Sequence, residues 1–229
     1  MNEEGPAQSS TRITGRIRAG AAVVMALLAL LAVALAVVLG ADHAGAVLLG
    51  ALGWFVALAA RLPVLGSAGR LHALRRRETI IALVSGATDE VVRLAVVLVA
   101  VSGVESALWA GFGWALAQLV FTAATELPKF SWPVGRQASE QLKAQGGFVS
   151  THPLHSAVRG VTAISFHLGA TLLLSAGLWW VAVTASAHVL VNIGFARWAG
   201  KRLVAVEVFA VVVGAVVLVA GLTSADVLG

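Results

Sequence analysis

The feature that most constrains this chain is its series of long apolar stretches. The first of them, 19–39, holds no charged residue at all. The others are 45–65, 79–102, 106–125, 159–197 (long enough for two helices that turn at Gly177) and 203–222. A membrane helix needs about 20 apolar residues to cross a hydrocarbon core about 30 Å thick. The pattern therefore predicts an all-α, polytopic membrane helix bundle with about seven transmembrane helices.

The composition excludes several other classes of protein. Of the 229 residues, 59% are hydrophobic and 12% are charged. A soluble domain of this length lacks the interior needed to bury so much apolar surface, which argues against a soluble globular enzyme, a disordered chain and a fibrous protein. The absence of cysteine excludes disulfides, cysteine-ligated zinc and thiol catalysis.

The basic residues predict an orientation. Apart from Arg93, every Lys and Arg lies in one of four segments, 12–18, 61–77, 129–159 and 197–202. In a chain with seven spans these segments all face one side, and the opposite connections carry no Lys or Arg. The positive-inside rule then places the N-terminus in the cytoplasm and the C-terminus outside, in a plasma or inner membrane. Because this explains the net charge of +5, membrane lipid is the expected partner and nucleic acid is not.

The spans and charges together predict the domain organisation. Residues 1–18 form a cytoplasmic N-terminal segment, 19–222 a single transmembrane domain, and 223–229 a short external tail. Within the domain, 79–198 bears the motifs described below, and 126–157 is a cytoplasmic loop. The stretch 19–39 is longer than the apolar region of a typical signal peptide and precedes a poor cleavage site, so we expect it to be retained as a span.

Three ionisable residues, Asp89, Glu90 and Arg93, interrupt the third apolar stretch. Each costs about 2.5–3.5 kcal/mol at the centre of a membrane helix. Both acids are within reach of Arg93 in a helix, at spacings of four and three residues. Because one acid suffices to neutralise the arginine, we expect the second to be left over, which makes it a functional candidate.

Other polar residues are expected at a similar depth. Gln118, His167 and His188 lie about 12–13 Å from the cytoplasmic ends of their spans, and Glu90 about 16 Å. Asn192 shares a helix face with His188. A carboxylate and two histidines in one membrane cavity are suited to hydrolysis, with Glu90 as general base, a histidine stabilising an oxyanion, and Asn192 donating a hydrogen bond.

The sequence leaves the cofactor open. A divalent metal such as zinc would be bound by Glu90, His167 and His188, and the same three residues also suit a metal-free centre. His152 and His155 form a His-x-x-His pair without an adjacent third ligand, and they are expected to be ordinary residues at the start of the fifth span. Glu207, near the cytoplasmic end of the last span, is likewise expected to be structural.

Four short segments of the sequence, in order, resemble the YhfC-type intramembrane proteases, relatives of the CAAX-prenyl-endopeptidase and bacteriocin-processing (CPBP) superfamily. The first is Gly86-Ala-Thr-Asp89-Glu90-Val-Val-Arg93, and the second is Gly111-Phe-Gly113-Trp114 with Gln118. The third is Phe166-His167-Leu-Gly-Ala-Thr-Leu-Leu-Leu-Ser175, and the fourth is His188-Val-Leu-Val-Asn192. The resemblance covers about 79–198.

The resemblance implies a glutamate-centred intramembrane protease that hydrolyses a peptide bond of a hydrophobic or lipidated peptide. Glu90 would activate water, with His167, His188 and Asn192 completing the catalytic centre. The supporting residues would be Asp89, Arg93, Gln118 and Trp114. Two positions depart from the family pattern, since Asp89 and Gln118 stand where a glutamate is usual. The alternatives are a non-catalytic membrane protein, such as an immunity or export accessory protein, and a small transporter.

Overall fold

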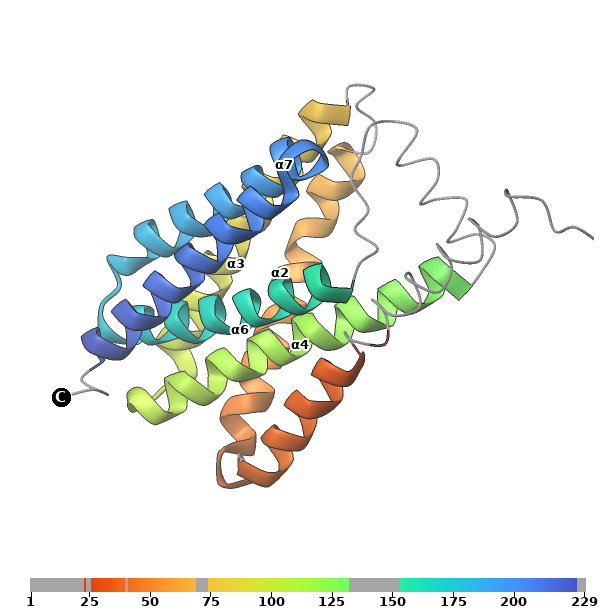
Figure 1. Ribbon diagram of the computed structural model, residues 1–229. Coiled ribbons are helices and arrows are strands. Elements are labelled where there is room, and N and C mark those ends of the chain that lie inside the picture. The colour runs from red at the N-terminus through yellow and green to blue at the C-terminus, as the bar shows by residue number, and fades with distance from the viewer. Residues whose placement is uncertain (1–22, 24–25, 40, 69–73, 132–152, 226–229) are drawn as a thin grey trace, which may run out of the picture.

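The computed structural model describes residues 23, 26–39, 41–68, 74–131 and 153–225, and this part of the chain contains helices and no strand. A helix at Ala26–Leu39 precedes the short 3-10 helix η1 (Ala41–His43). The longer helices are α2 (Ala44–Ala68), α3 (Leu74–Ala100), α4 (Gly103–Ser131), α6 (Pro153–Ala176) and α7 (Trp180–Ser224). Figure 1 shows them packed side by side as an elongated bundle.

The bundle places polar residues inside and large apolar residues outside. Val99 is 86% exposed and Val38 74%, whereas Glu90 and Arg93 are fully buried. The same inversion holds along the outer faces of the helices, where many Leu and Val side chains are exposed. Such a surface requires an apolar surrounding, because its exposed apolar area far exceeds what a soluble monomer presents to water. The expected membrane protein is therefore the class of protein that the structure shows.

Among the described residues, four helices are long and apolar enough to cross a membrane: Ala41–Ala68, Gly103–Ala124, Leu154–Ala176 and Trp180–Ser224. The helix at Ala26–Leu39 is apolar but shorter. α3 is not among the four, and it carries Asp89, Glu90 and Arg93 within its length. It nonetheless packs against α2 and α7, and the side chains of Asp89, Glu90 and Arg93 are buried, so these three charges face protein rather than lipid.

α7 is a helical hairpin rather than one long rod. Its 45 residues would extend about 68 Å if straight, more than twice the thickness of a hydrocarbon core. The backbone leaves the helical conformation at Arg202, with φ −140° and ψ 50°. A Cβ at Gly194 would lie 3.6 Å from a methyl of Val206, although twelve residues of straight helix would separate them by about 18 Å. The two segments therefore run side by side (Figure 1), as the predicted turn at 197–202 requires.

Glycines set the helix spacing around the polar layer. A Cβ at Gly86 of α3 would lie 2.8 Å from the backbone nitrogen of Val189, next to His188. A Cβ at Gly111 of α4 would lie 2.9 Å from the carbonyl oxygen of His167. Small residues thus let α7 approach α3, and α6 approach α4, at the residues that carry the imidazoles. Close packing is therefore the structural role of these glycines.

The helix bounds correct several expected boundaries. α3 begins at Leu74 rather than near 79, so Arg76 and Arg77 lie in a helix rather than a loop. α4 continues to Ser131, and α6 begins at Pro153, so the expected 126–157 loop is helical at both of its ends. α6 ends at Ala176, beside the predicted turn at Gly177. The segment 1–18, most of that loop with His152, and most of the tail lie outside the described residues.

Candidate functional site

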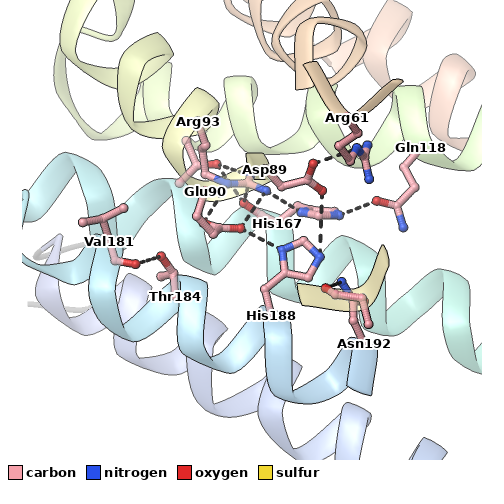
Figure 2. Close-up of polar contacts among 12 residues, drawn as sticks. Arg61, Asp89, Glu90, Arg93, Gln118, His167, Val181, Thr184, His188 and Asn192 are labelled. Carbon is pink, nitrogen blue, oxygen red and sulfur yellow. Dashed lines mark hydrogen bonds and ion pairs between the residues drawn. The ribbon is translucent and has the colours of Figure 1, made fainter. Parts of the chain in front are cut away.

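A buried ion-pair cluster occupies the middle of α3, and its pairing differs from the expected one (Figure 2). Arg93 pairs with Glu90, with Nε 3.2 Å from Oε2 and Nη2 3.4 Å from Oε1. Asp89 pairs instead with Arg61 of α2, at 3.3 Å. The expectation that one acid is left over is therefore wrong. Two carboxylates face two guanidiniums, which balances the charge and lowers the cost of burying each group.

Arg61 is the residue that sequence reasoning misplaced. It was assigned to a cytoplasmic loop as part of the orientation signal, but it lies within α2 with a side chain only 12% exposed. Its Nε also donates to the carbonyl oxygen of Ala57 at 3.1 Å. Its sequence position, at the end of an otherwise apolar stretch, was the available signal. The partner could not be identified, because the pairing depends on how α2 is rotated against α3.

His167 of α6 holds the arginine in place. Its Nδ1 lies 2.7 Å from Nη2 of Arg93, and its Nε2 lies 2.7 Å from Oε1 of Gln118. A guanidinium only donates, so Nδ1 must accept, and Nε2 must then carry the proton that Gln118 accepts. Both ring nitrogens are thereby occupied. His167 is buried, and its contacts identify it as a structural hub that links α3, α4 and α6.

The other nitrogen of the Arg93 guanidinium, Nη1, and the flat side of the group also have partners. Nη1 donates to the hydroxyl of Thr171 at 3.0 Å and to the carbonyl oxygen of His167 at 3.3 Å. The guanidinium carbon lies 4.2 Å from the ring centroid of Trp114, a cation–π contact. Trp114 thus supports the cluster as expected. Thr171 was not expected, because a threonine in an apolar helix gives no sign in the sequence of the arginine it will meet.

His188, in the first segment of α7, joins the cluster from the opposite side. Its Nδ1 lies 3.0 Å from Oε1 of Glu90, and its Nε2 lies 3.9 Å from Oδ2 of Asp89. Because an ionised carboxylate only accepts, Nδ1 donates to Glu90 and Nε2 is left with a lone pair in the neutral ring. Unlike Glu90, His188 retains exposure, at 13% of its side chain. It is the member of the cluster that combines a carboxylate partner with a place in the lining of a cavity.

A cavity of about 210 Å³ borders this histidine. Its walls come from α4, α6 and both segments of α7, and its polar lining consists of Gln118, Arg159, Thr162, His167, His188, Asn192 and Glu207. Asp89, Glu90 and Arg93 are not part of the lining. The polar lining therefore contains two imidazoles, two side-chain amides, a hydroxyl, a guanidinium and a carboxylate.

Asn192 lies one turn from His188, on the same face of α7 (Figure 2). Its Nδ2 donates to the carbonyl oxygen of Ala82 on α3 at 3.4 Å. A side-chain amide has two N–H donors and one acceptor, so one donor and the oxygen remain for a ligand in the cavity. The expected juxtaposition of the polar layer is thus confirmed. Glu90, Gln118, His167, His188 and Asn192 come from four helices to one place.

The positions of the nitrogen and oxygen donors in this layer determine whether it could bind a metal ion. Among the described residues, no group of three His, Cys, Asp or Glu side chains is placed to hold a metal ion. Within the trio expected for zinc, Nδ1 of His167 faces a guanidinium and Nε2 a glutamine oxygen, so neither nitrogen is available as a ligand. The residues of this layer therefore do not fit a zinc ion bound by Glu90, His167 and His188.

His155 and Glu207, for which the sequence predicts no functional role, form a second polar pair at the cavity. Nδ1 of His155 lies 2.6 Å from Oε2 of Glu207, which joins the start of α6 to the second segment of α7. The two residues are 52 positions apart, so no local pattern could have revealed the pair.

Comparison of the chain with models of known protein families, with curated proteins and with solved structures finds no match.

Proposed function

We propose that this protein is an intramembrane hydrolase, a protease that cuts a hydrophobic or lipidated peptide, with His188 as its general base. The observation that carries the proposal is the position of His188, which lines a cavity on one side and donates to the buried carboxylate of Glu90 on the other. A base needs a lone pair that is not used in another hydrogen bond and a partner that stabilises its protonated form. The hydrogen bond from Nδ1 to Glu90 provides the partner and leaves the lone pair on Nε2.

The mechanism follows from the same contacts. Nε2 of His188 removes a proton from water, and the resulting hydroxide attacks the peptide carbonyl carbon. Glu90 accepts the Nδ1 hydrogen bond and stabilises the imidazolium that forms. The free N–H of Asn192 donates to the developing oxyanion. His188 then returns the proton to the leaving amine as the C–N bond breaks. Glu90 thus orients the base rather than contacting water, a revision of the role that the sequence suggested.

The electrostatic setting supports this division of roles. Arg93 and Arg61 balance the two acids, so protonation of His188 adds one positive charge to an otherwise neutral cluster. Two carboxylates lie within 4 Å of its ring nitrogens, at 3.0 and 3.9 Å. The attraction between each carboxylate and a positive charge on the ring is stronger than it would be in water, because the surrounding medium has a low dielectric constant. The resemblance to the YhfC-type proteases in the order of these residues agrees with the proposal.

The proposal includes a topology of seven spans with a cytoplasmic N-terminus. It is supported by the two segments of α7, each about 22 residues long, and by the burial of the charged part of α3 inside the bundle. The exposed Lys201 and Arg202 at the turn of α7 would then face the cytoplasm. Cysteines introduced singly at 42 and 201, tested for labelling by an impermeant maleimide in intact cells, distinguish the sides. We expect labelling at 42 only.

The activity is tested in proteoliposomes with two quenched fluorescent substrates, a single-span peptide and a prenylated peptide. We expect cleavage of at least one by the wild type and its loss in His188→Ala and Glu90→Gln. His43→Gln is the matched control, because His43 stacks on Trp109 at the far end of α4 and does not line the cavity. Full cleavage by both variants would refute the proposal. If the protein instead moved substrate across the membrane without cleaving it, and this flux depended on His188, a transporter would replace the hydrolase as the proposed function.

A further inference from the structure

The wall of the cavity remote from His188 contains a buried carboxylate that the hydrolytic centre does not use. Glu207 is 5% exposed, and its Oε2 is held by Nδ1 of His155 at 2.6 Å. Its other oxygen, Oε1, is buried and has no hydrogen-bond partner among the described residues. A buried acceptor without a donor destabilises the folded protein, and more so when it is charged. A ligand that enters the cavity and brings a donor would remove this cost.

Glu207 and His188 line the same cavity. The lining of α6 runs from Val158 to His167, which is about 13 Å of helix. The lining also includes apolar side chains, among them Phe195 and Phe166, whose ring centroid lies 4.9 Å from that of His188. The cavity is therefore suited to an elongated group with an apolar body, one end of which meets Glu207 while the other end meets His188.

We propose that Glu207 is the recognition carboxylate of this cavity and that it binds an amino group of the ligand. Oε1 can only accept, so the ligand must bring a hydrogen-bond donor. An ammonium group supplies donors and charge together, and hydrogen bonds between charged groups are about twice as strong as neutral ones. His155 contributes by fixing the carboxylate through Oε2. The inference rests on the proposed function in one respect: the amino group is assigned to the hydrolase's peptide substrate.

The cavity also contains a cation, Arg159, that could recognise a ligand of the opposite charge. It lines the same cavity, and its Nε donates to the carbonyl oxygen of His155 at 3.3 Å. A ligand recognised by Arg159 would carry an anion rather than an ammonium group. The two possibilities differ in the sign of the ligand's charge, so one series of probes with a common apolar body separates them.

The test uses n-octylamine, n-octanol and octanoate as probes for the purified protein in lipid nanodiscs. The readout is the shift of the thermal unfolding midpoint with probe concentration, because a ligand of the native state raises that midpoint. We expect octylamine to bind about tenfold or more tightly than octanol to the wild type. Glu207→Gln should remove that preference. Glu105→Gln, an exposed carboxylate that pairs with His43 outside this cavity, should keep it.

Equal affinity of the wild type for octylamine and octanol would overturn the inference, as would tighter binding of octanoate. An octylamine preference that persists in Glu207→Gln would overturn it too. If that variant does not fold, inhibition of wild-type cleavage by the three probes gives the same ranking without a variant. Binding is measured without turnover. Amine binding without cleavage would therefore refute the hydrolase alone, and cleavage without amine preference would refute the recognition role alone.

Discussion

The imidazoles of His167 and His188 lie in the same polar layer, but they differ in how many of their ring nitrogens have hydrogen-bond partners. His167 has both nitrogens occupied, by Arg93 and by Gln118. His188 has one nitrogen on Glu90, and within the described part of the chain its other nitrogen makes no hydrogen bond and lies 3.9 Å from Oδ2 of Asp89. The sequence gives the two residues equal weight, as histidines at similar depth. Their hydrogen bonds distinguish an imidazole with both nitrogens engaged from one with a single engaged nitrogen, and the proposed function assigns the reaction to the second.

Removing the central cation should have the largest effect. Arg93→Leu leaves Glu90 charged and buried, and it deprives Nδ1 of His167 of its donor. Breaking one partner of a buried pair costs about 3–5 kcal/mol. We expect a loss of this size in the free energy of unfolding, measured by denaturant titration in mixed micelles. Arg61→Leu is the comparison, and we expect a smaller loss because its side chain is 12% exposed. Equal losses of unfolding free energy in the two variants would show that Arg93 stabilises the cluster no more than Arg61 does.

The second-largest effect is expected when α3 and α7 are forced apart. In Gly86→Val the new side chain meets the backbone of Val189 at 2.8 Å, so α7 must move away from α3. We expect the contact between His188 and Glu90 to lengthen and cleavage to fall by about 100-fold, as small misplacements of catalytic groups do. Gly45→Val is the control, because nothing lies within 4 Å of a Cβ there. Unchanged cleavage by Gly86→Val would show that the contact between His188 and Glu90 is not required.

Substitutions around His167 should affect stability more than chemistry. Gln118→Leu removes the acceptor for Nε2 of His167 and leaves a buried donor unpaired, at a cost of about 1–3 kcal/mol. We expect a lower unfolding midpoint, with the cleavage rate of the folded protein changed less than fivefold. A cleavage loss as large as that of His188→Ala would assign Gln118 to the reaction itself.

The smallest expected effect is at Thr171, whose hydroxyl accepts from Arg93 at 3.0 Å and donates to the carbonyl oxygen of His167 at 2.8 Å. Thr171→Val keeps the shape and removes one of several bonds to the guanidinium, so we expect a loss of about 1 kcal/mol in the free energy of unfolding. Thr223→Val is the matched control, since that hydroxyl is exposed and bonds only within its own helix. Identical losses would show that the Thr171 bond adds nothing.

The helices themselves could be predicted because hydrophobicity and length are local properties of the chain. The turns at Gly177 and near Arg202 were found in the same way, from a glycine and from a run of basic residues. The convergence of Glu90, Gln118, His167 and His188 followed from depth counting, since helical rise is regular. These parts of the fold and site depend on sequence position alone.

The pairings within the site could not be predicted. Both acids of α3 are within reach of Arg93 along the helix, and Glu90 is the one that pairs with it while Arg61 neutralises Asp89. The functional difference between the histidines likewise depends on what α4 and α3 place opposite each ring. Helix rotation and helix neighbours decide these contacts, and neither is encoded in the spacing of residues along one segment.

The most direct test of the account compares His188→Gln and His167→Gln in one preparation, measuring the cleavage rate per folded molecule beside the unfolding midpoint. We predict that His188→Gln loses about 100-fold or more in rate, the usual contribution of a general base, with little change in midpoint. His167→Gln should instead lose stability while its folded fraction still cleaves. The reverse pattern, with rate lost at His167 and stability lost at His188, would contradict the assignment of scaffold and reactive face.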